Sequence, residues 1–376
     1  MDTSTSNILP FINEIRTQHP VHHSLYLEFD GMRFRVAAST DAITDGLAHY
    51  FSGFVVPAGP YQVGVTVIQA PEADLPVAYT DHPPGPGKTR VKEAFADLPG
   101  GRIIRKVKTG MVFIVGSDQW FAVGPAVENL NQVVNFINNA LMARNLDRGY
   151  LLGHASGVVY NGRGLAMAGF AGSGKSTLAL HVMGIEGVQY LSNDRIMMKI
   201  REGRPVMKGL PKLPRINPGT ALNNPSLASI VPSHERERYQ RLSDEERWTL
   251  EQKYDVFIDD HFGPGRMVLN GPMDGLVILN WSRETKGQCT IREIDPRASL
   301  PLLDSIIKSP GLFYRPSTPI EHPSPEDYAA LLTHCRVFEV TGGVDFDYAT
   351  RFCFRFLAET TEGAATTENN HQRIWD

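Results

Sequence analysis

The sequence predicts a mixed α/β fold, with a mostly antiparallel β-rich domain at residues 1–125 and a larger α/β domain at residues 126–358. Two observations predict it. Short runs of alternating apolar and polar residues, typical of strands with one buried face, dominate the first 125 residues. Further on, the glycine-rich residues 169–177 lie between an apolar run and a helical pattern, the order typical of a strand, a phosphate-binding loop and a helix.

Strand patterns follow one another in the first domain. Residues 24–36 alternate with a period of two on either side of Asp30-Gly31, which predicts a hairpin. Further strands are expected at residues 61–69, 102–108, 110–115 and 120–123. A Pro/Gly-rich run at residues 81–88 predicts a turn-rich loop between them.

The second domain is expected to begin with a helix, because apolar residues recur at helical spacing from 127 to 142. A strand at 153–160, a tight turn at Asn161-Gly162 and an apolar run at 164–168 predict a hairpin that leads into the glycine-rich loop. Later elements are expected as strands at 188–191, 276–279 and 336–340, and as helices that start at 324 and span 348–357. The polar residues 359–376 predict a disordered tail.

Composition limits the classes of function. Lys and Arg total 37 and Asp and Glu total 41, so the formal net charge of -4 offers no broad basic field, and nucleic acid is not expected as a partner. The absence of a signal-peptide pattern and of an uncharged run of 18 apolar residues predicts a soluble cytoplasmic protein without membrane contact. The cysteines Cys289, Cys335 and Cys353 lack metal-ligand spacing and are expected in the core.

The glycine-rich loop has the pattern Gly-x4-Gly-Lys-Ser, in which glycines let successive backbone N–H groups converge on phosphate oxygens. Lys175 would place its ammonium near the β and γ phosphates of ATP, and the Ser176 hydroxyl would bind Mg²⁺. A glycine-rich turn that binds nothing is the alternative. The residues expected to contact the nucleotide are Gly169, Ala171, Gly172, Ser173, Gly174, Lys175, Ser176 and Thr177.

Asp194 and His154 are expected beside this loop. Asp194 follows Lys175 by 19 positions, which one helix and one strand fill, so its carboxylate can return to the loop and serve Mg²⁺ or an acceptor hydroxyl. His154 starts the preceding hairpin and can approach the phosphates or Asp194, with a core histidine as the alternative.

A Pro/Gly-rich segment at residues 207–219 supplies three cations that can close over a transferring phosphoryl group, Lys208, Lys212 and Arg215. A solvated loop is the alternative for them. The adjacent Asp259, Asp260 and His261 cannot all face one ion from a regular strand, so they are not expected to bind metal.

Together these motifs resemble the catalytic domain of HPr kinase/phosphorylase and, more closely, the HPr-kinase-related proteins of the kinase B type. The resemblance covers residues 125–280 and rests on His154, the loop at 169–176, Ser192-Asn193-Asp194-Arg195 and Pro211-x-x-Pro214-Arg215-Ile216-Asn217. It implies an HPr kinase-like P-loop domain in which the loop binds ATP, Asp194 works on Mg²⁺ and the acceptor hydroxyl, and His154 supports Asp194. It also implies that Arg215 matches an arginine of a later loop, and it suggests a homo-oligomer.

One departure from the family concerns Asn193, which stands where HPr kinase/phosphorylases have the first residue of an Asp-Asp pair. One carboxylate must then serve both Mg²⁺ and the acceptor hydroxyl, or His154 must help as the base. The glutamate that precedes the family's arginine is missing before Arg215, and the β-rich domain differs from the family's N-terminal domain, so neither the reverse phosphorylase activity nor HPr as acceptor is implied.

We therefore expect an ATP-dependent kinase that uses Mg²⁺ to transfer the γ-phosphoryl group to a hydroxyl of an unidentified protein or small-molecule acceptor. The expected catalytic residues are Asp194, His154, Lys175 and Arg215, and the expected metal ligands are Ser176 and Asp194. Asn193 favours an alternative, a nucleotide-dependent regulatory or binding module without phosphoryl transfer. An ordinary P-loop ATPase fits less well, because Asp194 follows the loop so closely.

Overall fold

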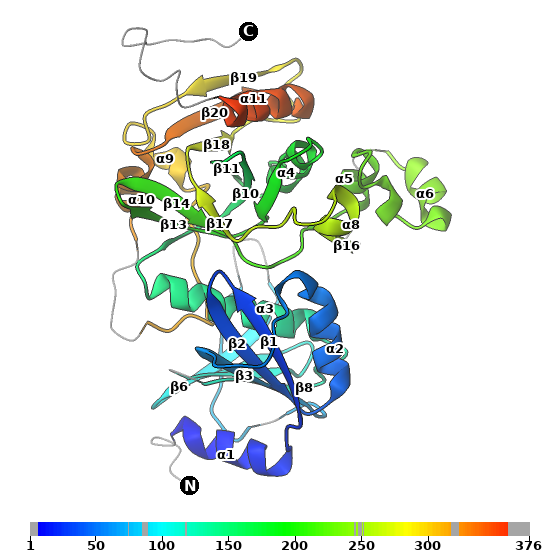
Figure 1. The fold of residues 1–376 in the computed structure, drawn as a ribbon, viewed down its shortest axis with the longest axis vertical. Coiled ribbons are helices and arrows are strands. Elements are labelled where there is room, and N and C mark those ends of the chain that lie inside the picture. Colours follow the sequence, from blue (N-terminus) through cyan, green and yellow to red (C-terminus); the bar gives the residue numbers. More distant parts are fainter. Residues whose placement is uncertain are drawn as a thin grey trace. The chain divides into compact units, whose positions relative to one another are not determined.

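The computed structural model describes residues 7–73, 75–84, 89–116, 119–243, 246, 250, 252–316 and 323–359. Residues 85–88 of the predicted turn-rich loop and residues 360–376 of the predicted tail lie outside this set. The chain forms two compact units, one of residues 1–148 with 310–320 and one of residues 149–309 with 321–376 (Figure 1). No helix among the described residues is long and apolar enough to cross a membrane.

The first unit is built on an eight-stranded sheet with the order β1-β2-β3-β8-β7-β6-β5-β4. Its strands are β1 (His23–Phe29), β2 (Met32–Ala38), β3 (Val63–Gln69), β4 (Thr80–Asp81), β5 (Glu93–Leu98), β6 (Gly101–Lys106), β7 (Val112–Gly116) and β8 (Gln119–Gly124). Antiparallel pairs predominate, as predicted, and β1 and β2 form the predicted hairpin at Asp30-Gly31. The parallel pairs of β3 with β2 and with β8 were not predicted, because a strand pattern carries no direction.

Helices cover both faces of this sheet (Figure 1). On one face, α1 (Ile8–Gln18) packs Ile12 against Ile103 and Phe121. The other face carries α2 (Asp41–Tyr50) and α3 (Leu130–Leu146), and there the ring of Phe136 lies 4.8 Å from that of Phe113. Helices α1 and α2, which are only 11 and 10 residues long, were not predicted. A 3-10 turn at Ser52–Phe54 follows α2.

Helix α3 was expected near the start of the second domain, since the predicted boundary lies at residues 125 and 126. The boundary between the compact units falls instead at residues 148 and 149. The reason is that α3 packs against β3, β8 and α2 of the first unit.

A segment from the second half of the chain, residues 310–316, also belongs to the first unit. Its Phe313 ring lies 5.5 Å from Phe113 and 5.8 Å from Phe136. The Tyr314 hydroxyl donates a hydrogen bond to Asp147 Oδ1 at 3.1 Å. The chain therefore enters the second unit, returns to complete an aromatic cluster of the first, and enters the second unit again.

The second unit contains a six-stranded sheet with the order β12-β10-β11-β18-β20-β19 and a four-stranded sheet with the order β17-β14-β13-β9. The first comprises β10 (Ala155–Tyr160), β11 (Arg163–Gly169), β12 (Gln189–Ser192), β18 (Gly275–Leu279), β19 (Cys289–Glu293) and β20 (Arg336–Gly342). The second comprises β9 (Leu151–Gly153), β13 (Ile196–Arg201), β14 (Arg204–Lys208) and β17 (Asn270–Pro272). A short pair joins β15 (Arg215–Ile216) to β16 (Tyr254–Asp255).

One hydrophobic core lies on each face of the six-stranded sheet. Under α4 and α11, the core includes Leu178 and Phe352, and on the other face Ile278 packs with Met198 and Tyr328. The helices of this unit are α4 (Lys175–Met183), α5 (Pro218–Leu222), α6 (Ser233–Gln240), α8 (Ile258–Phe262), α9 (Leu300–Leu303), α10 (Pro325–Leu332) and α11 (Phe346–Ala358), with a 3-10 turn at Ala228–Ile230.

The cysteines lie in or against these cores, as predicted. Cys289 and Cys353 are buried and Cys335 is half-buried. Burial raises the pKa of Cys289 to about 11 and the pKa values of Cys335 and Cys353 to about 12. All three thiols are therefore protonated at neutral pH.

The half-buried Arg266 binds carbonyl oxygens at the C-terminal end of α4. Its guanidinium donates hydrogen bonds to the carbonyl oxygens of Met183, Ile185 and Phe262 at 2.9 to 3.0 Å, and it also contacts that of Val188. Carbonyl groups at a helix end need such partners, because no further helical turn supplies them. One side chain thus joins α4, α8 and the segment that leads to β12.

We expect Arg266→Met to lower the free energy of unfolding by about 3 kcal/mol, because it leaves several partly buried carbonyl groups without a donor. Chemical denaturation would measure this. Arg241→Met is the matched control: that side chain is 81% exposed and its only described ion pair, with Glu237, is 3.7 Å long, so a change within about 0.5 kcal/mol is expected. Equal effects of the two substitutions would contradict this role of Arg266.

Candidate active site

Strand direction gathers the candidate residues at one edge of the six-stranded sheet. β10 is antiparallel to both β11 and β12, and β18 and β20 are parallel to β11. The carboxyl ends of β11, β12, β18 and β20 therefore meet at the edge where β10 begins. The glycine-rich loop follows β11, Asp194 lies just beyond β12, and His154 directly precedes β10. Ligands of α/β sheets commonly bind outside the carboxyl ends of strands.

The glycine-rich loop connects β11 to α4, as predicted, and curls through positive φ angles of 81° at Gly172 and 93° at Gly174. A Cβ on Gly169 would lie 2.5 Å from Ser173 Oγ and 2.8 Å from the Leu279 carbonyl oxygen, so the loop requires glycine there. The buried Ser173 Oγ forms no hydrogen bond with any described residue. A loop curled in this way can direct its backbone N–H groups at the oxygen atoms of a phosphate.

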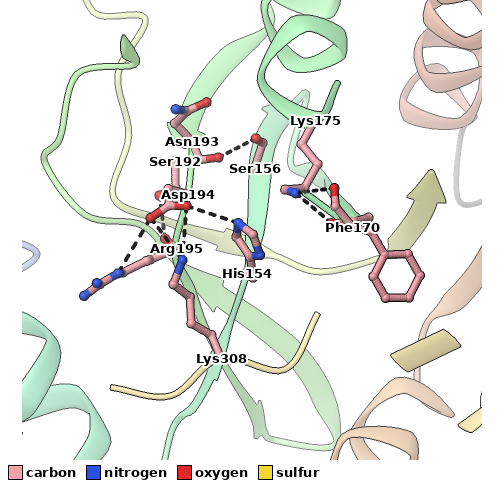
Figure 2. A network of polar contacts seen from close by, with 10 residues as sticks. His154, Ser156, Phe170, Lys175, Ser192, Asn193, Asp194, Arg195 and Lys308 are labelled. Carbon is pink, nitrogen blue, oxygen red and sulfur yellow. Dashed lines mark hydrogen bonds and ion pairs between the residues drawn. The ribbon is translucent and has the colours of Figure 1, made fainter. Parts of the chain in front are cut away.

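Lys175 is buried and folds back onto its own loop. Its Nζ donates hydrogen bonds to the carbonyl oxygens of Gly169 at 2.7 Å and Phe170 at 3.3 Å (Figure 2). Burial lowers the pKa of Lys175 to about 8, although the charge of Asp194 opposes this shift, and Lys308 adds to it. A bound anion would offset the burial and restore the ammonium form.

Asp194 is the centre of a polar cluster (Figure 2). Lys308 Nζ lies 3.2 Å from its Oδ1 and 3.3 Å from its Oδ2, and His154 Nε2 lies 3.2 Å from Oδ1. Arg195 Nε is 3.7 Å from Oδ2. The structure thus brings together Asp194 and His154, which the sequence analysis had placed beside the same loop.

The cluster keeps Asp194 ionised. Partial burial raises the pKa of its carboxyl, but the hydrogen bond from His154 and the charges of Lys308 and Arg195 outweigh this effect and hold the pKa well below its usual range. Its side chain is still 40% exposed, so a ligand can reach it. An ionised, accessible carboxylate can accept a hydrogen bond from a hydroxyl or bind a cation.

Asn193 does not take the place of a second carboxylate beside Asp194. Its backbone carbonyl accepts a hydrogen bond from Ser156 Oγ at 2.6 Å, and its side chain points away from Asp194 in Figure 2. The amide oxygen is buried and forms no hydrogen bond with a described residue. Of these two neighbouring residues, Asp194 therefore faces His154 and Lys308, and the Asn193 side chain does not.

Lys308 was missed by the sequence analysis. It reaches the site because the His154 backbone N–H donates to the Ile306 carbonyl at 2.6 Å, and Gly153 forms an isolated antiparallel bridge with Ile307. Lys308 lies 114 residues from Asp194 in a stretch with no motif. Nothing in the sequence pattern could have placed it there.

The three cations predicted to clamp a phosphoryl group occupy different environments. Lys212 is half-buried within electrostatic reach of Asp194 and Lys308, and burial lowers its pKa. Arg215 is exposed and pairs with Asp255 at 3.1 Å across β15 and β16. Lys208, at the end of β14, lies 5.2 Å from the ring centroid of Tyr150. The negative charge of Asp194 thus acts on Lys212.

The residues expected to bind Mg²⁺, Ser176 and Asp194, carry the oxygen donors that this ion prefers. Mg²⁺ usually keeps several waters and needs only one or two protein ligands, so the pair fits it chemically. Within the described part of the chain, no group of three His, Cys, Asp or Glu side chains is placed to hold a metal. Asp259, Asp260 and His261 lie on α8 rather than on the strand considered for them.

A scan for protein families finds no match to the chain, and neither does a search of curated proteins. Among solved structures, the chain is similar to the Hpr(Ser) kinase/phosphatase from Coxiella burnetii, with 12% identity, a TM-score of 0.27, and coverage of 55% of this chain and 92% of that chain. A similarity of this size shows neither the family nor the function of this chain.

The pKa of Lys175 should be visible in the pH dependence of stability. Because the folded chain binds fewer protons than the unfolded chain between a pKa of about 8 and the ordinary value of 10.5, the contribution of Lys175 to stability rises with pH in that window. The free energy of unfolding should increase relative to Lys175→Met by about 1–2 kcal/mol from about pH 7.5 to about pH 9.5. Lys253→Met, at an exposed position, is the control. Parallel pH curves for wild type and Lys175→Met would contradict the shifted pKa.

Proposed function

We propose that this protein is an ATP-dependent kinase that transfers the γ-phosphoryl group to a hydroxyl of a protein or small-molecule acceptor. The observation that carries this proposal is the ionised Asp194, held by His154 and Lys308 at the edge of the sheet where the glycine-rich loop lies. A loop suited to phosphate and a carboxylate suited to a hydroxyl are the two parts that phosphoryl transfer requires.

In the proposed reaction, the acceptor oxygen forms a bond to the γ-phosphorus while the bond from that phosphorus to the β–γ bridging oxygen breaks, which yields ADP and a phosphoester. Asp194 accepts a hydrogen bond from the acceptor hydroxyl and receives its proton, and His154 orients the carboxylate through Nε2. The low pKa of Asp194 makes it a weak base. This suffices, because phosphoryl transfer through a loose transition state needs positioning more than strong deprotonation.

Positive side chains neutralise the charge of the phosphates. Lys175 would leave the Gly169 carbonyl for the β and γ phosphates, and Lys308 and Lys212 would face the transferring group. Mg²⁺, held by Ser176 and Asp194 when bound, would supply further neutralisation of the phosphate oxygens. Arg215 would join only if its ion pair with Asp255 opened, so its proposed role depends on movement of the β15–β16 segment.

A nucleotide-dependent regulatory module without phosphoryl transfer is the second candidate. It is favoured by the single carboxylate at Asp194 and the side chain of Asn193, which points away from it. In such a module the nucleotide would shift a conformational equilibrium and no acceptor would exist.

Asp194→Asn should separate the two candidates. With γ-labelled ATP, Mg²⁺ and a cell extract as the source of acceptor, the wild type should give a discrete labelled product, and Asp194→Asn should lower its rate of formation by about 100-fold or more. Lys175→Met should weaken ATP binding itself. Asp260→Asn, at an exposed position on α8, is the control and should keep the wild-type rate.

Transfer that survives Asp194→Asn unchanged would overturn the proposed role of this carboxylate. Tight ATP binding with only slow hydrolysis and no labelled product would instead support the regulatory module.

Lys308→Met should lower kcat for phosphoryl transfer by about 10- to 100-fold with a smaller change in the KM for ATP, because its charge is needed where negative charge develops. Lys308→Arg should restore part of the rate, since it keeps the positive charge. Steady-state kinetics at saturating acceptor would measure both. A rise in KM alone would show that Lys308 only helps to hold the nucleotide.

A further inference from the structure

A pocket of about 440 Å³, open to solvent, lies directly beside the glycine-rich loop and has no part in the chemistry at Asp194. It is lined by Gly287, Gln288, Val344, Asp345, Phe346 and Asp347. These residues come from the loop before β19 and from the start of α11. Its volume is within the range of about 300–1,000 Å³ typical of small-molecule sites.

Phe346, the aromatic residue that lines the pocket, packs against the glycine-rich loop. A Cβ on Gly174 would lie 2.7 Å from the Phe346 ring, so the loop backbone packs against that ring. Trp281 donates a hydrogen bond from Nε1 to the Ser173 carbonyl at 2.7 Å, and its ring lies 5.1 Å from that of Phe346. His181 stacks behind Phe346 at 5.6 Å and 29°. Phe346 is thus fixed in position and only half-buried, as a stacking platform requires.

The pocket lies on the opposite side of the loop from Asp194. In the sheet order, β10 and β12 flank β11 on one side, whereas β18, β20 and β19 lie on the other. Asp194 follows β12, and the pocket is formed after β20 and before β19. A triphosphate that lay along the loop with its γ end at Asp194 would have its other end on the side of the loop where the pocket lies.

The chemistry of the pocket suits a group that is aromatic and carries no negative charge. Asp345 and Asp347 would repel phosphate, but their oxygens can accept hydrogen bonds from sugar hydroxyls. One oxygen of Asp345 already caps α11 by accepting from the Tyr348 N–H at 2.9 Å, whereas Asp347 is exposed. The Phe346 face turned away from His181 can stack on a heterocyclic base.

We propose that this pocket binds the nucleoside part of the nucleoside triphosphate, with the base stacked on Phe346 and the sugar hydroxyls bonded to Asp345 and Asp347. The inference rests on the proposed function, since it assumes that the glycine-rich loop holds the phosphates with their γ end at Asp194. It assigns the two ends of one substrate to the two sides of β11.

Comparison of ATP with inorganic tripolyphosphate tests the proposal, because only ATP carries a nucleoside. Calorimetric titration should show that the wild type binds ATP more tightly than tripolyphosphate. Phe346→Leu, which keeps an apolar side chain against Gly174 but removes the aromatic ring, should weaken ATP binding by about tenfold or more and leave tripolyphosphate binding within about twofold. Gln288→Trp, which fills the pocket from an exposed position without touching the core, should do the same. Arg355→Ala, at an exposed position of α11, is the control.

Other outcomes would contradict the assignment of this pocket to the nucleoside. Equal losses for ATP and tripolyphosphate in both variants, or no loss for either ligand, would overturn the nucleoside assignment and leave phosphate binding by the loop intact. Failure of the wild type to bind either ligand would overturn the proposed function itself, and the assignment with it.

Discussion

The antiparallel pairing of β10 with both β11 and β12 is the constraint on which the candidate site depends. It makes β11 and β12 parallel neighbours of the same strand, so that the loop after one and Asp194 after the other emerge at one edge. It also places His154, at the start of β10, between them. A different pairing of any of these strands would separate a loop suited to phosphate from the carboxylate that faces it.

Charge at this edge is arranged before any ligand binds. Asp194 neutralises Lys308 and Arg195 in part, and Lys175 is satisfied by carbonyl oxygens of its own loop. Burial of cations without an anion is costly, and the lowered pKa values of Lys175 and Lys212 record that cost. The proposed polyphosphate ligand would offset this cost by supplying negative charge beside both cations.

The local parts of this site could be predicted, and the long-range parts could not. The strand, loop and helix around Lys175 and the return to Asp194 follow from glycine spacing and from the short interval between them. Lys308 and Phe346 reach the site through a backbone bridge and through helix packing, over distances that no sequence pattern encodes. For the same reason the hairpin at Asp30-Gly31 was predicted, whereas the parallel pairing of β3 and the assignment of α3 to the first unit were not.

The return of residues 310–316 to the first unit bears on the order in which the protein is made. A ribosome releases the first unit's sheet and α3 long before it releases Phe313, which packs against Phe113 and Phe136. Domains usually fold in turn as they emerge, but this one lacks part of its aromatic cluster until most of the second unit has been synthesised. Its nascent chain therefore carries an incomplete hydrophobic core while residues 147–313, nearly half of the chain, are synthesised.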